Sequence, residues 1–249
     1  MRIAVLGGSG VVGRHVVEIA AARGHEATAC SRRTGVDLVT GAGLDSALEG
    51  VAVAIDVSTT RSVRRRPARE FFEAAARHLQ AACSRQGVAH VIVLSIVGID
   101  QLRAWGYYDA KLTQERLNLD GPVGVTVLRA TQFHEFPGQL AARSTVAGVT
   151  AVPDLLVQTV AARSAAEALV DVAGSDGPTG RGADLAGPGP PTRLPALVRA
   201  TLERDGRRAR VLGVRVPGAM GRAVRDGALL PPPDAHLVGP TFEAWLKAR

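Results

Sequence analysis

Apolar residues in the first half of the chain change their spacing from one short segment to the next. Runs rich in Val, Ile and Ala predict strands over residues 2–6, 26–31, 51–57, 88–97 and 125–131. Between these runs, helical spacing recurs over residues 11–23, 44–48, 67–86 and 107–119. Strands that alternate with helices predict βαβ units, and strands that are apolar throughout indicate a parallel sheet covered on both faces. We therefore expect an α/β fold with a doubly wound parallel sheet.

The pattern is weaker after about residue 137. It predicts strands over residues 155–160 and 183–186, helices over 164–173 and 195–204, and an amphipathic turn over 242–246. This contrast predicts a nucleotide-binding core of residues 1–136 and a smaller C-terminal lobe of residues 137–249, packed as one integrated domain. The lobe is expected to complete the sheet and bind a substrate, with a protein-binding surface as the alternative.

Composition limits the class of protein. Of the 249 residues, 46% are apolar and 21% are charged, which is typical of a globular chain. No apolar run approaches the roughly 20 residues of a membrane helix, and the N-terminus lacks the order of a signal peptide. Cys30 and Cys83 are too few for a disulfide framework, and the six histidines lack metal-ligand spacing. We expect a cytoplasmic protein with reduced thiols, no metal and no membrane partner.

The net charge of +7 comes almost entirely from arginine. A basic chain suggests nucleic-acid binding, but these arginines are scattered and no aromatic residues are interleaved with them to stack on bases. We therefore interpret the charge as compositional and expect no nucleic-acid partner. A small-molecule substrate is expected, and a homodimer is left open.

Three glycines, Gly7, Gly10 and Gly13, separate the first strand from the first helix. The first permits a tight turn, the second lets backbone amides approach a pyrophosphate, and the third lets the helix pack close to the sheet. The helix N-terminus adds free N–H groups and partial positive charge. A purely structural turn is the alternative. The predicted dinucleotide contacts are Gly7, Ser9, Gly10, Val11, Val12 and Gly13.

The second predicted strand ends at Ser31, Arg32 and Arg33. A site for NAD(H) would place a carboxylate here to bind the ribose 2′-hydroxyl, whereas guanidinium groups suit a 2′-phosphate. The sequence therefore favours NADP(H), with NAD(H) as the lesser alternative and two merely solvated arginines as the other interpretation. Further predicted cofactor contacts are Asp37 and Leu38 at the adenine, and Ser58 and Thr59 along the cofactor path.

Tyr107 and Lys111 are four residues apart and so share one face of a helix. A nearby ammonium lowers the pKa of a phenol, which would let Tyr107 exchange a proton with a carbonyl oxygen near neutral pH. Lys111 could also reach the nicotinamide ribose. Ser95, at the end of a strand, could stabilise charge that develops on a substrate oxygen. Tyr108 is an alternative proton donor.

These motifs together resemble the short-chain dehydrogenase/reductase superfamily, and within it the atypical, NmrA-like branch. The resemblance implies a Rossmann fold, a nicotinamide cofactor and reduction of carbonyl, quinone or enone groups. The ordinary Asn-Ala-Gly after the strand ending near residue 57 is replaced by Ser58, Thr59 and Thr60, as expected of an atypical member. The matching segments are residues 7–13, 31–33, 94–98, 107–111 and 128–133.

In the scheme of that family, Thr131 follows a strand beside the nicotinamide. The residues after it line the substrate pocket: Gln132, Phe133, His134 and Phe136. His134 is either a second acid/base group or an ordinary packed histidine.

The leading hypothesis is an NADP(H)-dependent oxidoreductase that moves hydride to or from a carbonyl, quinone or enone-type small molecule. Tyr107 would be its acid/base group, Lys111 the ribose anchor and Ser95 the oxyanion donor. One alternative is a regulatory protein that senses NADP(H) without catalysis. A further alternative is a non-redox or net-neutral enzyme, such as an epimerase or cyclase, on the same fold.

Overall fold

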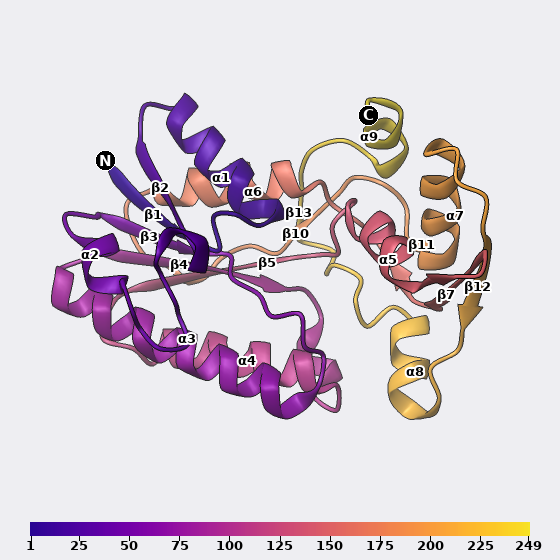
Figure 1. Ribbon diagram of the computed structural model, residues 1–249, viewed down its shortest axis with the longest axis horizontal. Helices are drawn as coiled ribbons and strands as arrows, with labels where there is room; N and C mark the ends of the chain where they lie inside the picture. Colours follow the sequence, from indigo (N-terminus) through magenta and orange to yellow (C-terminus); the bar gives the residue numbers. More distant parts are fainter. The chain divides into compact units, whose positions relative to one another are not determined.

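The computed structural model describes residues 1–249 and divides them into two compact units (Figure 1). The chain passes between the units several times. Residues 130–136, expected in the core, belong to the second unit, and residues 163–183, expected in the C-terminal lobe, belong to the first. Unit 1 comprises Met1–Ile96, Arg103–Arg129 and Arg163–Ala183; unit 2 comprises Val97–Leu102, Ala130–Ala162 and Asp184–Arg249.

A mostly parallel sheet runs through unit 1 in the order β5-β4-β3-β1-β2. The pairs β1–β2, β1–β3 and β3–β4 are parallel, and a short strand, β9 (Gly180–Arg181), adds to β5 in parallel. This confirms the predicted parallel α/β sheet, and each predicted strand of the first half is present. Their bounds are β1 (Arg2–Leu6), β2 (Glu26–Cys30), β3 (Val53–Asp56), β4 (His90–Ile96) and β5 (Val125–Ala130).

Helices cover both faces of this sheet. Figure 1 shows α3 and α4 along one face, and α1 and α6 along the other. An apolar cluster including Leu6, Val93 and Leu79 fills the space between the strands and α3, where the predicted Val and Ile runs become buried. The helices are α1 (Val11–Ala22), α2 (Leu44–Leu48), α3 (Arg65–Gln86), α4 (Gly106–Leu119) and α6 (Ala162–Ala173), with 3-10 turns η1 (Arg32–Thr34) and η2 (Ile99–Leu102). None of the helices is both long enough and apolar enough to cross a bilayer.

Unit 2 contains several elements that the sequence did not predict. One is a small sheet of β6 (Thr145–Val146), β7 (Val149–Pro153) and β12 (Arg210–Val214), against which α5 (Phe136–Ser144) and α7 (Leu194–Arg204) pack. The sequence missed α5 because it opens on Phe-Pro-Gly, although proline is tolerated in the first turn of a helix. The predicted segments 155–160, 183–186 and 242–246 correspond to β8 (Leu156–Val157), β10 (Leu185–Ala186) and α9 (Phe242–Lys247), and the helix predicted over 195–204 is α7. The remaining elements are β11 (Thr192–Arg193), α8 (Gly218–Arg225) and β13 (His236–Leu237).

Candidate active site

The loop between β1 and α1 has a conformation that requires glycine. Gly7 adopts φ +82°, in the left-handed region. A Cβ on Gly13 would collide with the carbonyl oxygen of Gly7, and one on Gly8 would lie 2.7 Å from Cα of Ala29 on β2. Gly10 is the N-cap residue of α1, and no side chain caps that helix. The uncapped N–H groups therefore remain available to an anion, and the loop brings the backbone close enough to bind one.

The predicted phosphate-binding arginines lie on the 3-10 turn after β2. The backbone N–H of Ser31 donates to Oγ1 of Thr34 over 2.8 Å, and this bond closes the turn. Arg32 and Arg33 are exposed and form no ion pair. The turn carries no carboxylate, so its charge suits an added phosphate better than a ribose hydroxyl.

The predicted adenine contacts are already engaged within their own loop. Oδ1 of Asp37 accepts a hydrogen bond of 2.8 Å from the backbone N–H of Val39. Leu38 is buried in the apolar cluster, and its carbonyl lies 3.0 Å from Nδ1 of His78. Both residues stabilise the loop, and their role at a cofactor stays a prediction.

Tyr107 lies at the start of α4, with its hydroxyl 2.8 Å from Oγ1 of Thr59. Its ring packs edge-on against Phe72, with 5.5 Å between ring centroids. Burial raises the pKa of Tyr107 above its ordinary value, and the hydrogen bond with Thr59 opposes that effect. The expectation that Lys111 lowers this pKa is therefore wrong, because burial determines the direction of the shift.

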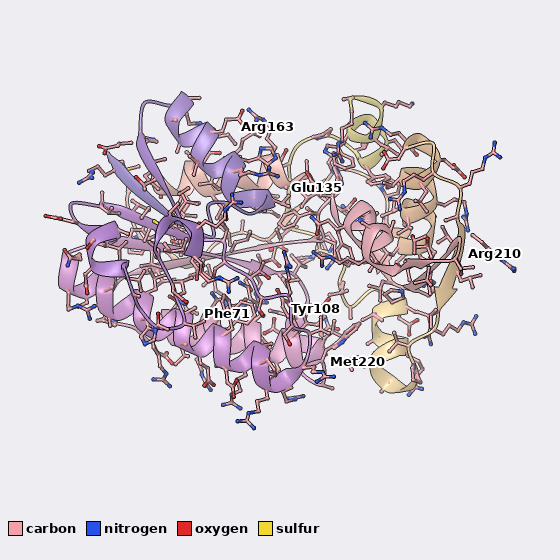
Figure 2. All side chains as sticks on the ribbon, viewed as in Figure 1. Phe71, Tyr108, Glu135, Arg163, Arg210 and Met220 are labelled. Atoms are coloured by element: carbon pink, nitrogen blue, oxygen red, sulfur yellow. The ribbon has the colours of Figure 1, made fainter.

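Tyr108, the alternative proton donor, has a different environment at the start of α4, where Figure 2 labels it. Burial raises the pKa of Tyr108 as well. Its ring contacts Trp105 edge-on, with centroids 5.4 Å apart, and no hydrogen bond holds its hydroxyl. Since only Tyr107 has a hydroxyl partner that can orient it, the geometry favours Tyr107.

Lys111 is buried, with only 4% of its surface exposed. Its Nζ donates to Oε1 of Gln114 over 2.6 Å, and Nε2 of Gln114 donates to Oδ2 of Asp56 over 2.8 Å. The ammonium also lies 4.9 Å from the ring centroid of Phe72. Burial lowers the pKa of Lys111 to about 8, although the negative charges of Asp56 and Glu115 act to raise it. Lys111 can thus change its protonation state close to neutral pH.

Six buried side-chain nitrogen or oxygen atoms have no hydrogen-bond partner, and five of them belong to predicted site residues. In unit 1 these are Oγ of Ser58, directly after β3, and Oγ of Ser95, near the end of β4. In unit 2 they are Oγ1 of Thr131 and both amide atoms of Gln132. An unpaired buried polar atom costs about 1–3 kcal/mol, so such atoms concentrate where a ligand can pair with them.

His134 in unit 2 does not suit acid/base chemistry. It is fully buried, its Nε2 donates to the carbonyl of Pro240 over 3.1 Å, and its Nδ1 lies 2.8 Å from Oγ1 of Thr159. Its ring packs against Phe242 and Trp245 of α9. Both ring nitrogens are occupied and burial lowers the pKa of His134, so the packed-histidine interpretation fits better.

The two predicted pocket phenylalanines are half-buried in unit 2. Phe133 forms a β-bridge with Val160, and Phe136 opens α5. The backbone holds both in place, and their contact with a substrate stays a prediction.

Two residues of the site were missed from the sequence. Asp56, the last residue of β3, is fully buried, and its Oδ1 accepts from the backbone N–H of Ser58 over 2.8 Å. Gln114, one helical turn after Lys111, is also fully buried. The sequence did contain a signal for each residue. Asp56 is a carboxylate at the end of an apolar strand, and Gln114 is a polar residue three positions after Lys111.

The sequence matches no protein-family model and no curated protein. The fold does match solved structures. MoeE5 in complex with UDP-glucose and NAD is 21% identical, over 88% of this chain and 87% of that one, with a TM-score of 0.70. A UDP-N-acetylglucosamine 4-epimerase from Bacillus cereus is 16% identical over 100% and 97%, with a TM-score of 0.68. The NADPH-dependent quinone oxidoreductase QOR2 from Escherichia coli, complexed with NADPH, is 18% identical over 99% of both chains, with a TM-score of 0.69.

These likenesses establish the fold class. The chain has a Rossmann-like α/β fold, shared with the epimerase and with two proteins solved in complex with NAD or NADPH. The predicted fold class is thereby confirmed, while the reaction and the branch belong to the proposal below.

Proposed function

We propose that this protein is an NADP(H)-dependent oxidoreductase of the short-chain dehydrogenase/reductase superfamily, in its atypical, NmrA-like branch. It would move hydride between the nicotinamide and a carbonyl, quinone or enone-type small molecule. The observation that carries the proposal is the identity of the residues that hold unpaired buried polar atoms. Five of six belong to residues that the sequence assigns to a ligand: Ser58, Ser95, Thr131 and Gln132.

The residues present fit a nicotinamide dinucleotide. The glycine loop and the uncapped N-terminus of α1 would hold the pyrophosphate. Arg32 and Arg33 would bind the 2′-phosphate, and Lys111 would bind the nicotinamide ribose. The cofactor, when bound, supplies or accepts the hydride.

Proton handling would fall to Tyr107. Because burial raises the pKa of Tyr107, the phenol is protonated at neutral pH and suits the role of an acid in the direction of reduction. Thr59 can donate to the phenol oxygen while the phenol proton points to a substrate oxygen. Ser95 has a free hydroxyl with which to stabilise charge on that oxygen.

A second candidate is a net-neutral enzyme such as an epimerase, and it is favoured by the fold likeness to a UDP-N-acetylglucosamine 4-epimerase and to MoeE5. An epimerase of this kind returns its hydride to the same substrate. It would therefore show no net oxidation of added NADPH, which separates it from the leading proposal. The regulatory alternative needs the glycine loop but not Tyr107.

Titration of the purified protein with NADPH and NADH, followed by nicotinamide fluorescence, tests the proposal. We expect NADPH to bind more tightly than NADH, and Arg32→Ala to remove most of that preference. Arg208→Ala is a matched control, since Arg208 is also an exposed arginine without an ion pair. Binding should be followed by a screen of carbonyls and quinones for NADPH oxidation. Absence of binding by both nucleotides would refute the proposal.

A further inference from the structure

We propose that Gln114 is a positioning residue for Lys111. Its carboxamide connects the Lys111 ammonium to the Asp56 carboxylate, which orients the ammonium and sets its proton affinity. The inference rests on the proposed function, in which Lys111 binds the cofactor ribose. Neither Gln114 nor Asp56 belongs to the Tyr, Lys and Ser set from which that function was argued.

The three side chains form one continuous buried chain of hydrogen bonds. Lys111 Nζ donates to Gln114 Oε1 over 2.6 Å, and Gln114 Nε2 donates to Asp56 Oδ2 over 2.8 Å. Gln114 and Asp56 are fully buried. Only one orientation of the amide serves both partners, because a flipped amide would turn its NH₂ to the ammonium and its oxygen to the carboxylate.

The amide bridge leaves part of Lys111 free. An ammonium has three donors, and here one goes to Gln114 while the other two have no hydrogen-bond partner in the chain. The other buried cation, Arg129, instead makes two direct bonds to Glu115, of 2.9 and 2.7 Å. The bridged lysine therefore keeps two donors for a ligand.

The end of β3 and the loop after it are hydrogen-bonded to both Tyr107 and, through Gln114, Lys111. Asp56 bonds to the N–H of Ser58 and, through Gln114, to Lys111. Thr59, the residue after Ser58, bonds to the hydroxyl of Tyr107. Gln114 thus ties Lys111 to the same segment that orients Tyr107.

The choice of lysine at this position supports a role in proton affinity. The chain has 28 arginines and only two lysines, Lys111 and Lys247, and a guanidinium does not lose its proton in a protein. The charged groups that face Lys111 are Asp56 on β3 and Glu115 on α4, and Arg129 neutralises Glu115. Tyr107 lies one turn earlier on α4, and the thiol of Cys83 on α3 lies close enough to Asp56 to sense its charge. Asp56 is therefore the facing carboxylate that no arginine neutralises, and Gln114 connects it to Lys111.

The two-lysine composition makes a direct test available. Full-length protein labelled with ¹³Cε-lysine gives two lysine signals, which Lys247→Arg assigns, and their shifts against pH report the pKa of Lys111. We expect Gln114→Met to lower that pKa by about one unit or more, a tenfold loss of proton affinity, because the ammonium loses its acceptor. Gln114→Glu should raise the pKa, because a carboxylate replaces the amide.

Gln80→Met is the matched control. Gln80 is a buried glutamine with two hydrogen bonds, to Asn118 and to the N–H of Val123, and it does not touch Lys111. This variant should lose comparable stability in thermal unfolding while leaving the pKa of Lys111 unchanged. Equal pKa values in Gln114→Met and Gln80→Met would overturn the proposal. A folding defect would expose Lys111 and return its pKa towards the ordinary value of 10.5, so the lower pKa expected in Gln114→Met cannot arise from instability. The rise expected in Gln114→Glu counts in favour of the proposal only where thermal unfolding shows that variant to be folded.

Titration with NADPH separates this inference from the proposed function. If Gln114 positions Lys111 for the ribose, Gln114→Met should weaken NADPH binding about tenfold, and Gln80→Met should not. A shifted pKa together with unchanged NADPH affinity would overturn the positioning role. Failure of the wild-type protein to bind NADPH would refute the proposed function instead, and the lysine titration alone would then decide whether Gln114 sets the proton affinity of Lys111.

Discussion

The hydroxyl of Tyr107 lies 2.8 Å from Oγ1 of Thr59, a residue 48 positions earlier in the chain. This hydrogen bond orients the phenol and offsets part of the rise in its pKa that burial causes. An ordinary loop threonine after β3 thus becomes a partner of the predicted proton donor. The relationship makes Thr59 as informative a target for mutation as Tyr107 itself.

Thr59→Val should raise the pKa of Tyr107 further, because the hydrogen bond that lowers it is lost while burial remains. A phenol that must be protonated stays so to higher pH. The alkaline limb of the rate profile for reduction should therefore move upward, with a lower kcat from poorer orientation. Thr59→Ser, which keeps the hydroxyl, should restore both values. The profile of kcat against pH measures this effect, and an unmoved alkaline limb in Thr59→Val would contradict it.

Tyr107→Phe should reduce turnover by about 10²–10⁴-fold, the usual contribution of a positioned acid or base. NADPH affinity should stay within about twofold, since the phenol is assigned to the substrate and not to the cofactor. Tyr108→Phe is the matched control, because it removes the neighbouring phenol, whose hydroxyl has no hydrogen bond. Steady-state kinetics and nicotinamide fluorescence give the two readouts. Equal losses in both variants would reject Tyr107 as the proton donor.

Arg129→Met should destabilise the fold by about 3–5 kcal/mol, because Glu115 would keep a buried charge without its main partner. Arg129 and Glu115 have side-chain exposures of only 6% and 2%. Arg66→Met is the control: Arg66 pairs with Glu70 on the solvent face of α3 with 90% exposure, and its loss should be close to neutral. Urea denaturation measures both variants. A similar change in the two free energies of unfolding would show that Arg181, 3.3 Å from Glu115, replaces the buried pair.

Stability should fall as the pH drops below about 6.5, the ordinary pKa of histidine. Burial lowers the pKa of both His90 and His134, so at acidic pH the unfolded chain binds more protons than the folded chain does. Each such histidine contributes up to about 1.4 kcal/mol per pH unit between its unfolded and folded pKa. His134→Gln should reduce this slope, while His236→Gln, at an exposed position, should not. Urea denaturation at pH 7 and pH 5 tests the prediction, and an unchanged slope in His134→Gln would count against it.

Local pattern was sufficient for most of unit 1. The five strands and the helices α1, α2, α3 and α4 were all predicted from the residues, the longer helices α1 and α3 from a clear apolar period, and a parallel sheet buries the apolar positions of its strands on both faces. The glycine loop was also readable, since the positive φ of Gly7 and the close packing of Gly13 exclude side chains at those positions. Position next to a strand end likewise identified Ser58 and Ser95.

Only the tertiary structure decided the partners of the polar side chains. Gln114 and Asp56 are 58 residues apart, and His134 and Pro240 are 106 residues apart. No spacing along the chain predicts contacts between residues so distant in sequence. The pairing of β7 with β12 was likewise not predicted. The two strands begin their pairing at Val149 and Arg210, and each strand is too short to be recognised from its apolar residues alone. Hydrogen bonds between distant residues depend on which groups the packed core brings together, whereas strand and helix periods depend on neighbours in sequence. The amino-acid sequence therefore determined the layers and the loop for a phosphate, and the hydrogen bond between Gln114 on α4 and Asp56 on β3 decided how Lys111 is held.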